Sequence, residues 1–94
     1  MSRIRAELAE IERVSRQMAE GGHQVGQTAQ QLRGRIQGMS WQGRAREEFM
    51  QRYGQTEGMT RQLAEMMADL SRELQHLAAD LRRAEEESLR QSRS

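Results

Sequence analysis

Apolar side chains recur along the first half of the chain in alternating steps of four and three residues. This is the heptad period of helices that pack side by side at a shallow angle. The series is interrupted only at Ser15 and Gly22, and it predicts one helix over about residues 2–38. The residues of this series that we expect in the core are Ile4, Leu8, Ile11, Met18, Val25, Leu32 and Ile36.

A second series with the same spacing runs from Phe49 to Ala84. It predicts a second helix over about residues 43–91, which is weakest where Thr56 and Thr60 occupy apolar positions. Because the series continues through the middle of this helix, we expect its central members in the core as well. These are Leu63, Met67, Leu70, Leu74 and Leu77.

Turn-type residues separate the two series, and they place the turn at about residues 39–42. Gly38 suits the C-cap of the first helix and Ser40 the N-cap of the second. The predicted fold class is therefore all-α. A single domain over residues 1–94 forms an antiparallel helix-turn-helix hairpin.

Two helices cannot cover both apolar stripes by themselves, and a continuous apolar strip remains along one side of the hairpin. Dimerisation into a four-helix bundle would cover it, with an identical chain or with a related small helical protein. We favour the homodimer, because neither stripe carries an uncompensated charge that would be buried.

The position of the turn also predicts which residues face each other. A turn centred near residue 40 places Ile4 opposite Leu77, and a tail from about residue 81 projects beyond the hairpin. Leu89 is an isolated apolar residue of that tail. Two interpretations stay open: the tail is a solvated, fraying helix end, or Leu89 is a docking point for another protein.

Composition excludes several classes of function. The 94 residues include 15 basic residues, all arginine, and 14 acidic ones, and there is no cysteine or proline. Disulfide scaffolds, thiolate nucleophiles and cysteine-ligated metals are thereby excluded, and a net charge of +1 argues against nucleic-acid binding. His23 and His76, the only histidines, do not face each other in the predicted register. We therefore expect no enzyme, metal site or cofactor.

Two pairs of glycines fall almost opposite each other in the predicted hairpin. They are Gly22-x-x-x-Gly26 and Gly54-x-x-x-Gly58. Small residues one turn apart let helix backbones approach closely. The helices are accordingly predicted to come closest near these glycines.

Opposite charges at one-turn spacing predict ion pairs on the helix surfaces. Such pairs support helicity and solubility and indicate nothing about function. They are Glu12 with Arg16, Glu48 with Arg52, and Glu86 with Arg90.

The three aromatic residues of the chain lie within thirteen residues of one another, at the turn and the start of the second helix. They are Trp41, Phe49 and Tyr53. Trp41 either closes the end of the bundle or stands exposed as an anchor for a partner. Both interpretations remain open at this point.

The segment around Trp41 resembles a known family. Trp41-x-Gly43 lies between two helices, midway along a chain of about a hundred residues, with Ala45 and Phe49 two and six residues after Gly43. This pattern resembles the WXG family of small type VII (ESX) secretion substrates, of the early-secreted-antigen type. The resemblance implies a dimeric four-helix bundle that a membrane-bound secretion ATPase exports folded, without a cleaved signal peptide.

In that family the Trp-x-Gly turn and the partner's tail form a composite export signal, and the tail carries Tyr-x-x-x-Asp/Glu. Here the only tyrosine is Tyr53, and its spacing to Glu57 is interpreted as a coincidence because it lies early in the second helix. His76 and Asp80 resemble another tail pattern, but Glu87 stands where that pattern has a second histidine. Either a partner supplies the tail signal, or this tail uses a different pattern.

The sequence thus supports a secreted, non-enzymatic effector, adaptor or export partner whose turn and tail are recognised by the export machinery. The alternative is a structural coiled-coil or adaptor module in which Trp41 only closes the bundle. A third hypothesis is perturbation of membranes by unmasked amphipathic helices. No segment of the chain has the 18 or more apolar residues of a membrane span.

Overall fold

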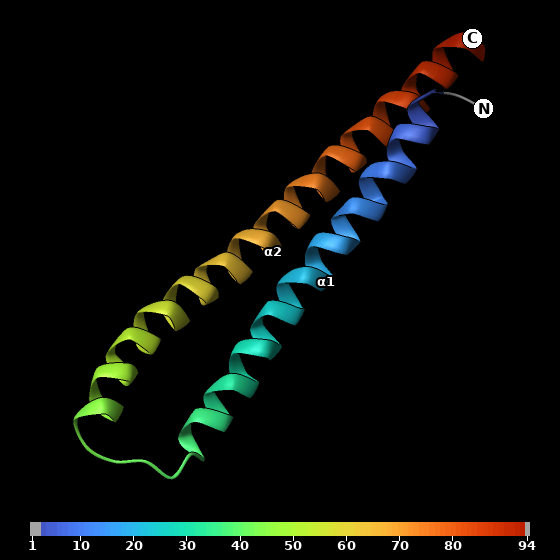
Figure 1. Ribbon diagram of the computed structural model, residues 1–94. Coiled ribbons are helices and arrows are strands. Elements are labelled where there is room, and N and C mark those ends of the chain that lie inside the picture. Colours follow the sequence, from blue (N-terminus) through green and yellow to red (C-terminus); the bar gives the residue numbers. More distant parts are fainter. Residues whose placement is uncertain (1–2, 94) are drawn as a thin grey trace.

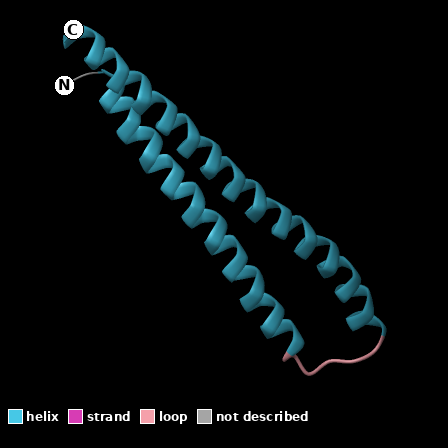
Figure 2. Ribbon diagram, turned by 180° about the vertical axis from the view of Figure 1, so that it is seen from behind, coloured by secondary structure: helices cyan, strands magenta, loops and turns pink. Residues whose placement is uncertain are grey.

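The computed structural model describes residues 3–93 and consists of two long helices joined by a short loop (Figure 1). α1 spans Arg3–Gln37 and α2 spans Arg44–Arg93. The molecule is a narrow rod of 77 × 17 × 14 Å, with helix as the only regular structure in the described part (Figure 2). The predicted all-α hairpin is confirmed. Residue 2, where the first helix was predicted to begin, lies outside the described residues.

The hydrogen bonds at the loop differ from the predicted caps. The N–H of Gly38 still donates to the carbonyl of Gly34 at 3.0 Å, and Gly38 has no positive φ, so it is not a left-handed C-cap. The carbonyl of Gly43, rather than that of Ser40, accepts the first hydrogen bond of α2, from the N–H of Glu47 at 3.2 Å. The whole segment 38–43 is needed to connect the separated helix ends, so α2 cannot begin at Ser40.

The two helices meet along a line of small residues, which we call the small-residue seam. Ser15 and Gly22 of α1 and Ser71 and Ala78 of α2 are all buried. The hydroxyl of Ser71 donates a hydrogen bond of 2.7 Å to the backbone carbonyl of Ser15. The two residues that interrupt the apolar series of α1 are therefore at the centre of the contact, because small side chains let the backbones approach.

Gly22 marks a point of close approach. A Cβ atom placed there would lie 3.1 Å from the carbonyl oxygen of Ala64 and 3.3 Å from the Cβ of Met67. Gly26, Gly54 and Gly58 would meet nothing within 4 Å. The predicted close approach is right at Gly22 and wrong at the other three glycines, because α2 bends away from α1 toward the loop (Figure 1).

The same bend changes which residues face each other. Near the loop the Tyr53 hydroxyl lies 3.3 Å from the Ala29 carbonyl, close to the predicted register. Farther from the loop Ser71 meets Ser15, where the predicted register would place Met66. Because α2 follows the longer, curved path, it uses more residues than α1 over the same stretch.

This shift corrects the predicted tail. Arg82 pairs with Glu12, and Glu85 lies 3.6 Å from Arg5, so α2 stays against α1 well beyond residue 81. Only the last turns of α2 extend past the start of α1 (Figure 1). The predicted facing of Ile4 and Leu77 is also wrong, because Ala78 is the buried residue at this end of α2.

The seam can be tested with two glycine variants. We expect Gly22→Ala to lower the free energy of unfolding by about 1–2 kcal/mol, since overpacking costs about 1–3 kcal/mol and helix propensity returns up to about 1 kcal/mol. We expect Gly26→Ala to be neutral or stabilising, because its Cβ meets open space. Urea unfolding followed by circular dichroism, at equal protein concentration, measures both. Equal effects of the two variants would contradict a close approach at Gly22.

Candidate functional site

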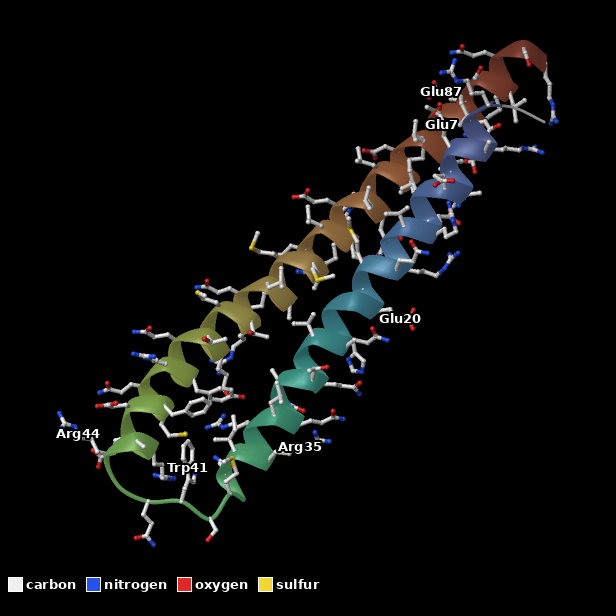
Figure 3. The ribbon with its side chains drawn as sticks, viewed as in Figure 1. Glu7, Glu20, Arg35, Trp41, Arg44 and Glu87 are labelled. Carbon is white, nitrogen blue, oxygen red and sulfur yellow. The ribbon has the colours of Figure 1, made fainter. Side chains whose placement is uncertain are left out.

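The three aromatic rings form a ladder at the loop end of the hairpin. The ring centroids of Trp41 and Phe49 are 5.3 Å apart in an edge-on arrangement, at an interplanar angle of 61°. Phe49 and Tyr53 are stacked at 6.1 Å and 14°. Tyr53 then reaches the Ala29 carbonyl of α1 through its hydroxyl. The ladder therefore ties the loop to both helices, and Figure 3 shows Trp41 between the two helix ends.

Trp41 is half-buried, and its indole Nε1 is buried without a hydrogen-bond acceptor among the described residues. A buried donor left without a partner costs about 1–3 kcal/mol. The indole thus covers the end of the hairpin and at the same time keeps one donor unused. Both functions predicted for Trp41, closing the end and anchoring a partner, are compatible with this position.

Gly43 has a conformational role. Its φ of +90° lies in the left-handed region that glycine adopts without strain. In this conformation its carbonyl accepts the first hydrogen bond of α2, from the N–H of Glu47. The glycine of the Trp-x-Gly motif therefore occupies the N-cap position and sets where α2 begins. Ala45 follows on the first turn of α2 and is exposed.

The candidate tail residue lies far from this cluster. Leu89 is partly exposed and lines a hollow with Leu8 and Arg5, close to the start of α1. Figure 3 shows Glu87 and Glu7 at one end of the rod and Trp41 at the other. The loop and the tail of one chain are therefore separated by most of its 77 Å length.

Tyr53 and Glu57, which share the spacing of the tail motif, both act within the hairpin. Tyr53 belongs to the aromatic ladder, and the Glu57 carboxylate lies 3.5 Å from Arg33 of α1 and 3.6 Å from Arg61 of α2. Both side chains are thus engaged in packing and ion pairing within the hairpin.

Ion pairs between the helices line one side of the hairpin, which we call the polar face. Arg33 pairs with Glu57 near the loop, and Arg82 with Glu12 near the other end. Two predicted partners are thereby corrected. Glu12 meets Arg82 across the hairpin rather than Arg16, because the helices approach there, and Glu48 pairs with Arg44 at 3.4 Å rather than with Arg52.

The opposite side, which we call the apolar face, remains open. Leu8 is the one buried residue of the predicted core among the described residues. Seven others are half-buried: Ile4, Ile11, Met18, Val25, Ile36, Met67 and Leu74. Four predicted core residues are 45–54% exposed instead: Leu32, Leu63, Leu70 and Leu77.

The leucines of α2 are exposed because of how α2 is rotated about its own axis relative to α1. Ala64 lies against Gly22, and Ser71 and Ala78 are buried in the same row of the helix. Leu63 and Leu70 come one residue before Ala64 and Ser71, so they lie about 100° around the helix, beside the contact. The heptad pattern could not choose between these neighbouring rows, because both are apolar or small.

The apolar face also contains a groove of about 540 Å³ where the helices diverge. Val25, Leu32, Tyr53 and Met67 are among the residues that line it. On the outer side of α2 next to this face lie Met59 and Met66, which are 63% and 59% exposed. Sequence reasoning missed these two methionines, although their separation of seven residues places them in one row.

Comparison with known proteins identifies the pattern. Residues 3–86 match a family model described as "Proteins of 100 residues with WXG". No curated protein and no solved structure matches the chain significantly. Neither described helix is long and apolar enough to cross a membrane.

The role of Gly43 is testable by substitution. We expect Gly43→Ala to lower the free energy of unfolding by about 1–2 kcal/mol, because a residue with a Cβ is strained at positive φ. Gly34→Ala is the matched control: it lies inside α1 with nothing within 4 Å of its Cβ, and alanine should stabilise it. Thermal unfolding followed by circular dichroism compares the two. A Gly43→Ala protein as stable as the wild type would contradict the requirement for glycine.

Proposed function

Because the chain belongs to the WXG100 family, we propose that it is a non-enzymatic substrate of a type VII (ESX) secretion system, exported folded as a dimer. Members of this family are small helical proteins secreted by type VII systems. The observation that carries the proposal is the Trp-x-Gly turn at the loop end, within a family match over residues 3–86.

The open apolar face supports a dimer. Leu63, Leu70 and Leu77 are about half exposed in one row of α2, and Leu32 is exposed beside the groove. Burying apolar surface contributes about 25 cal/mol per Å², so a partner that covers this face gains considerable free energy. The partner is the same chain or a related small helical protein, and two hairpins together make a four-helix bundle.

The separation of loop and tail supports a composite export signal. Trp41 and Leu89 of one chain lie at opposite ends of the rod, so only an antiparallel partner brings a tail beside Trp41. The indole of Trp41 is half-buried, so the exposed part of its ring is a surface against which that tail or the machinery packs. Trp41, Gly43 and the tail around Leu89 are then recognised by the secretion ATPase, which places the protein outside the cell without a cleaved signal peptide.

The edge-on contact of Trp41 with Phe49 favours one alternative. In that case the protein is a structural coiled-coil or adaptor module unrelated to secretion, and Trp41 only closes the end of the bundle. Contact of the open apolar face with a membrane is a further alternative, which release of dye from liposomes would test.

Substitution of Trp41 separates export from structure. We expect Trp41→Ala to abolish appearance of the protein in the culture medium of a strain with a type VII system, while light scattering on the purified variant still gives a dimer mass. Phe49→Ala is the matched control, because it breaks the same ring contact and keeps the indole.

A Trp41→Ala protein that is exported normally would contradict the proposed signal. Loss of export in both variants, accompanied by loss of the dimer in both, would favour the structural alternative. Export of Phe49→Ala together with retention of Trp41→Ala in the cell supports recognition of the indole itself.

A further inference from the structure

One row of side chains along α2 has a self-complementary arrangement of charged and apolar residues. Arg52, Met59, Met66 and Glu73 are spaced by seven residues each, so they occupy the same heptad position and form one stripe along the helix. All four are exposed. Reversed end to end, the stripe places a positive charge opposite a negative one at each end and methionine opposite methionine in between.

The stripe lies on the outer edge of the apolar face. Leu63 and Leu70 form the adjacent row, between the stripe and the residues that face α1. In a bundle the rows nearest α1 point toward the common core, and the stripe would lie at the boundary with the neighbouring helix of the partner. A surface of this kind, apolar in the centre and charged at its ends, is suited to one orientation of that neighbour.

The two charged residues are not used within the hairpin. Among residues 3–93, Glu48 pairs with Arg44 and Asp69 with Arg72, whereas Arg52 and Glu73 have no ion-pair partner. Both side chains are therefore free to pair with another molecule.

We propose that α2 docks antiparallel against α2 of a second copy, in a register that sets Arg52 opposite Glu73 and Met59 opposite Met66. This arrangement rests on the proposed dimer and adds which helices meet and how they are aligned. A two-fold axis between residues 62 and 63 generates each contact twice, as an isologous interface requires. Near that axis Leu63 lies opposite Gln62 and close to its own copy, and Leu70 lies opposite Gln55.

Other orientations lack this complementarity. In a parallel pair in register, Arg52 would face Arg52 and Glu73 would face Glu73, and like charges in contact are unfavourable. In an antiparallel pair shifted by seven residues, a charged residue of one stripe, such as Arg52, would face a methionine of the other. The occupant that the stripe fits is therefore a second copy of this chain, turned end to end.

Charge reversal tests the register. We expect Arg52→Glu and Glu73→Arg each to raise the dimer dissociation constant by about tenfold or more, because each places two like-charge pairs in the interface. A mixture of the two variants should form heterodimers of nearly wild-type affinity, since both pairs are then of opposite sign. Sedimentation gives the dissociation constants, and native mass spectrometry counts homodimers and heterodimers.

Matched controls carry the same charge changes elsewhere. Arg16→Glu and Glu65→Arg alter exposed residues outside the apolar face, and we expect neither to change dimerisation. A mixture of Arg52→Glu and Glu73→Arg chains that shows no preference for heterodimers would overturn the proposed register, while a wild-type dimer would leave the proposed function standing. A wild-type chain that stays monomeric would overturn the second copy as partner.

Disulfide trapping gives an independent measurement, because the chain has no cysteine. A mixture of Met59→Cys and Met66→Cys chains should cross-link under oxidation. Each variant alone should not, since identical positions would be about 10 Å apart along the axis and a disulfide needs Cα atoms within about 7 Å. Cross-linking of either variant with itself, at the rate of the mixture, would contradict the antiparallel register.

Discussion

The close approach of the two backbones along the small-residue seam determines how the rest of the hairpin is arranged. A Cβ at Gly22 would lie only 3.1 Å from the Ala64 carbonyl oxygen, and the buried hydroxyl of Ser71 donates to the Ser15 carbonyl. Such a contact requires small residues on both helices and leaves little freedom of rotation. Once Ala64, Ser71 and Ala78 face α1, the neighbouring rows of α2 must face elsewhere.

This rotation gives the hairpin its two faces. On one side arginines and glutamates of opposite helices lie close enough to pair, as Arg33 with Glu57 and Arg5 with Glu85. On the other side leucines that belong to the heptad pattern stay about half exposed. In both ion pairs the arginine is more than half exposed, so solvent screens the attraction and the pairs add little stability. The apolar face is where further burial is available, which connects the packing of one chain to its assembly.

The loop end combines local conformation with recognition. Gly43 adopts a positive φ and caps α2, so the Trp-x-Gly motif has a structural reason for its glycine. Trp41 packs edge-on against Phe49 but keeps an indole N–H without an acceptor. The same residues thus close the hairpin and carry the surface that we propose is recognised in secretion.

Much of this protein was predictable from local pattern. The heptad spacing indicated two helices, and the motif around Trp41 indicated the family, because both signals lie in short stretches of sequence. The rows of Leu63 and Ala64 could not be told apart in this way, since each continues a heptad and each consists of apolar or small residues. Met59 and Met66 were not predicted as a surface for a related reason. Which row of α2 is exposed is known only once it is known which row contacts α1.

The sequence by itself determined the helical hairpin, the position of its turn and the excess of apolar surface for one chain, since these follow from periodicity, glycine placement and length. The tertiary structure decided the rotation and register of α2. The bend toward the loop and the contact at Gly22 depend on atoms far apart in sequence, and they moved the facing residues by about five positions at Ser15. With this rotation and register, Arg82 and Glu85 of α2 pair with residues of α1, and several leucines and methionines of α2 stay exposed.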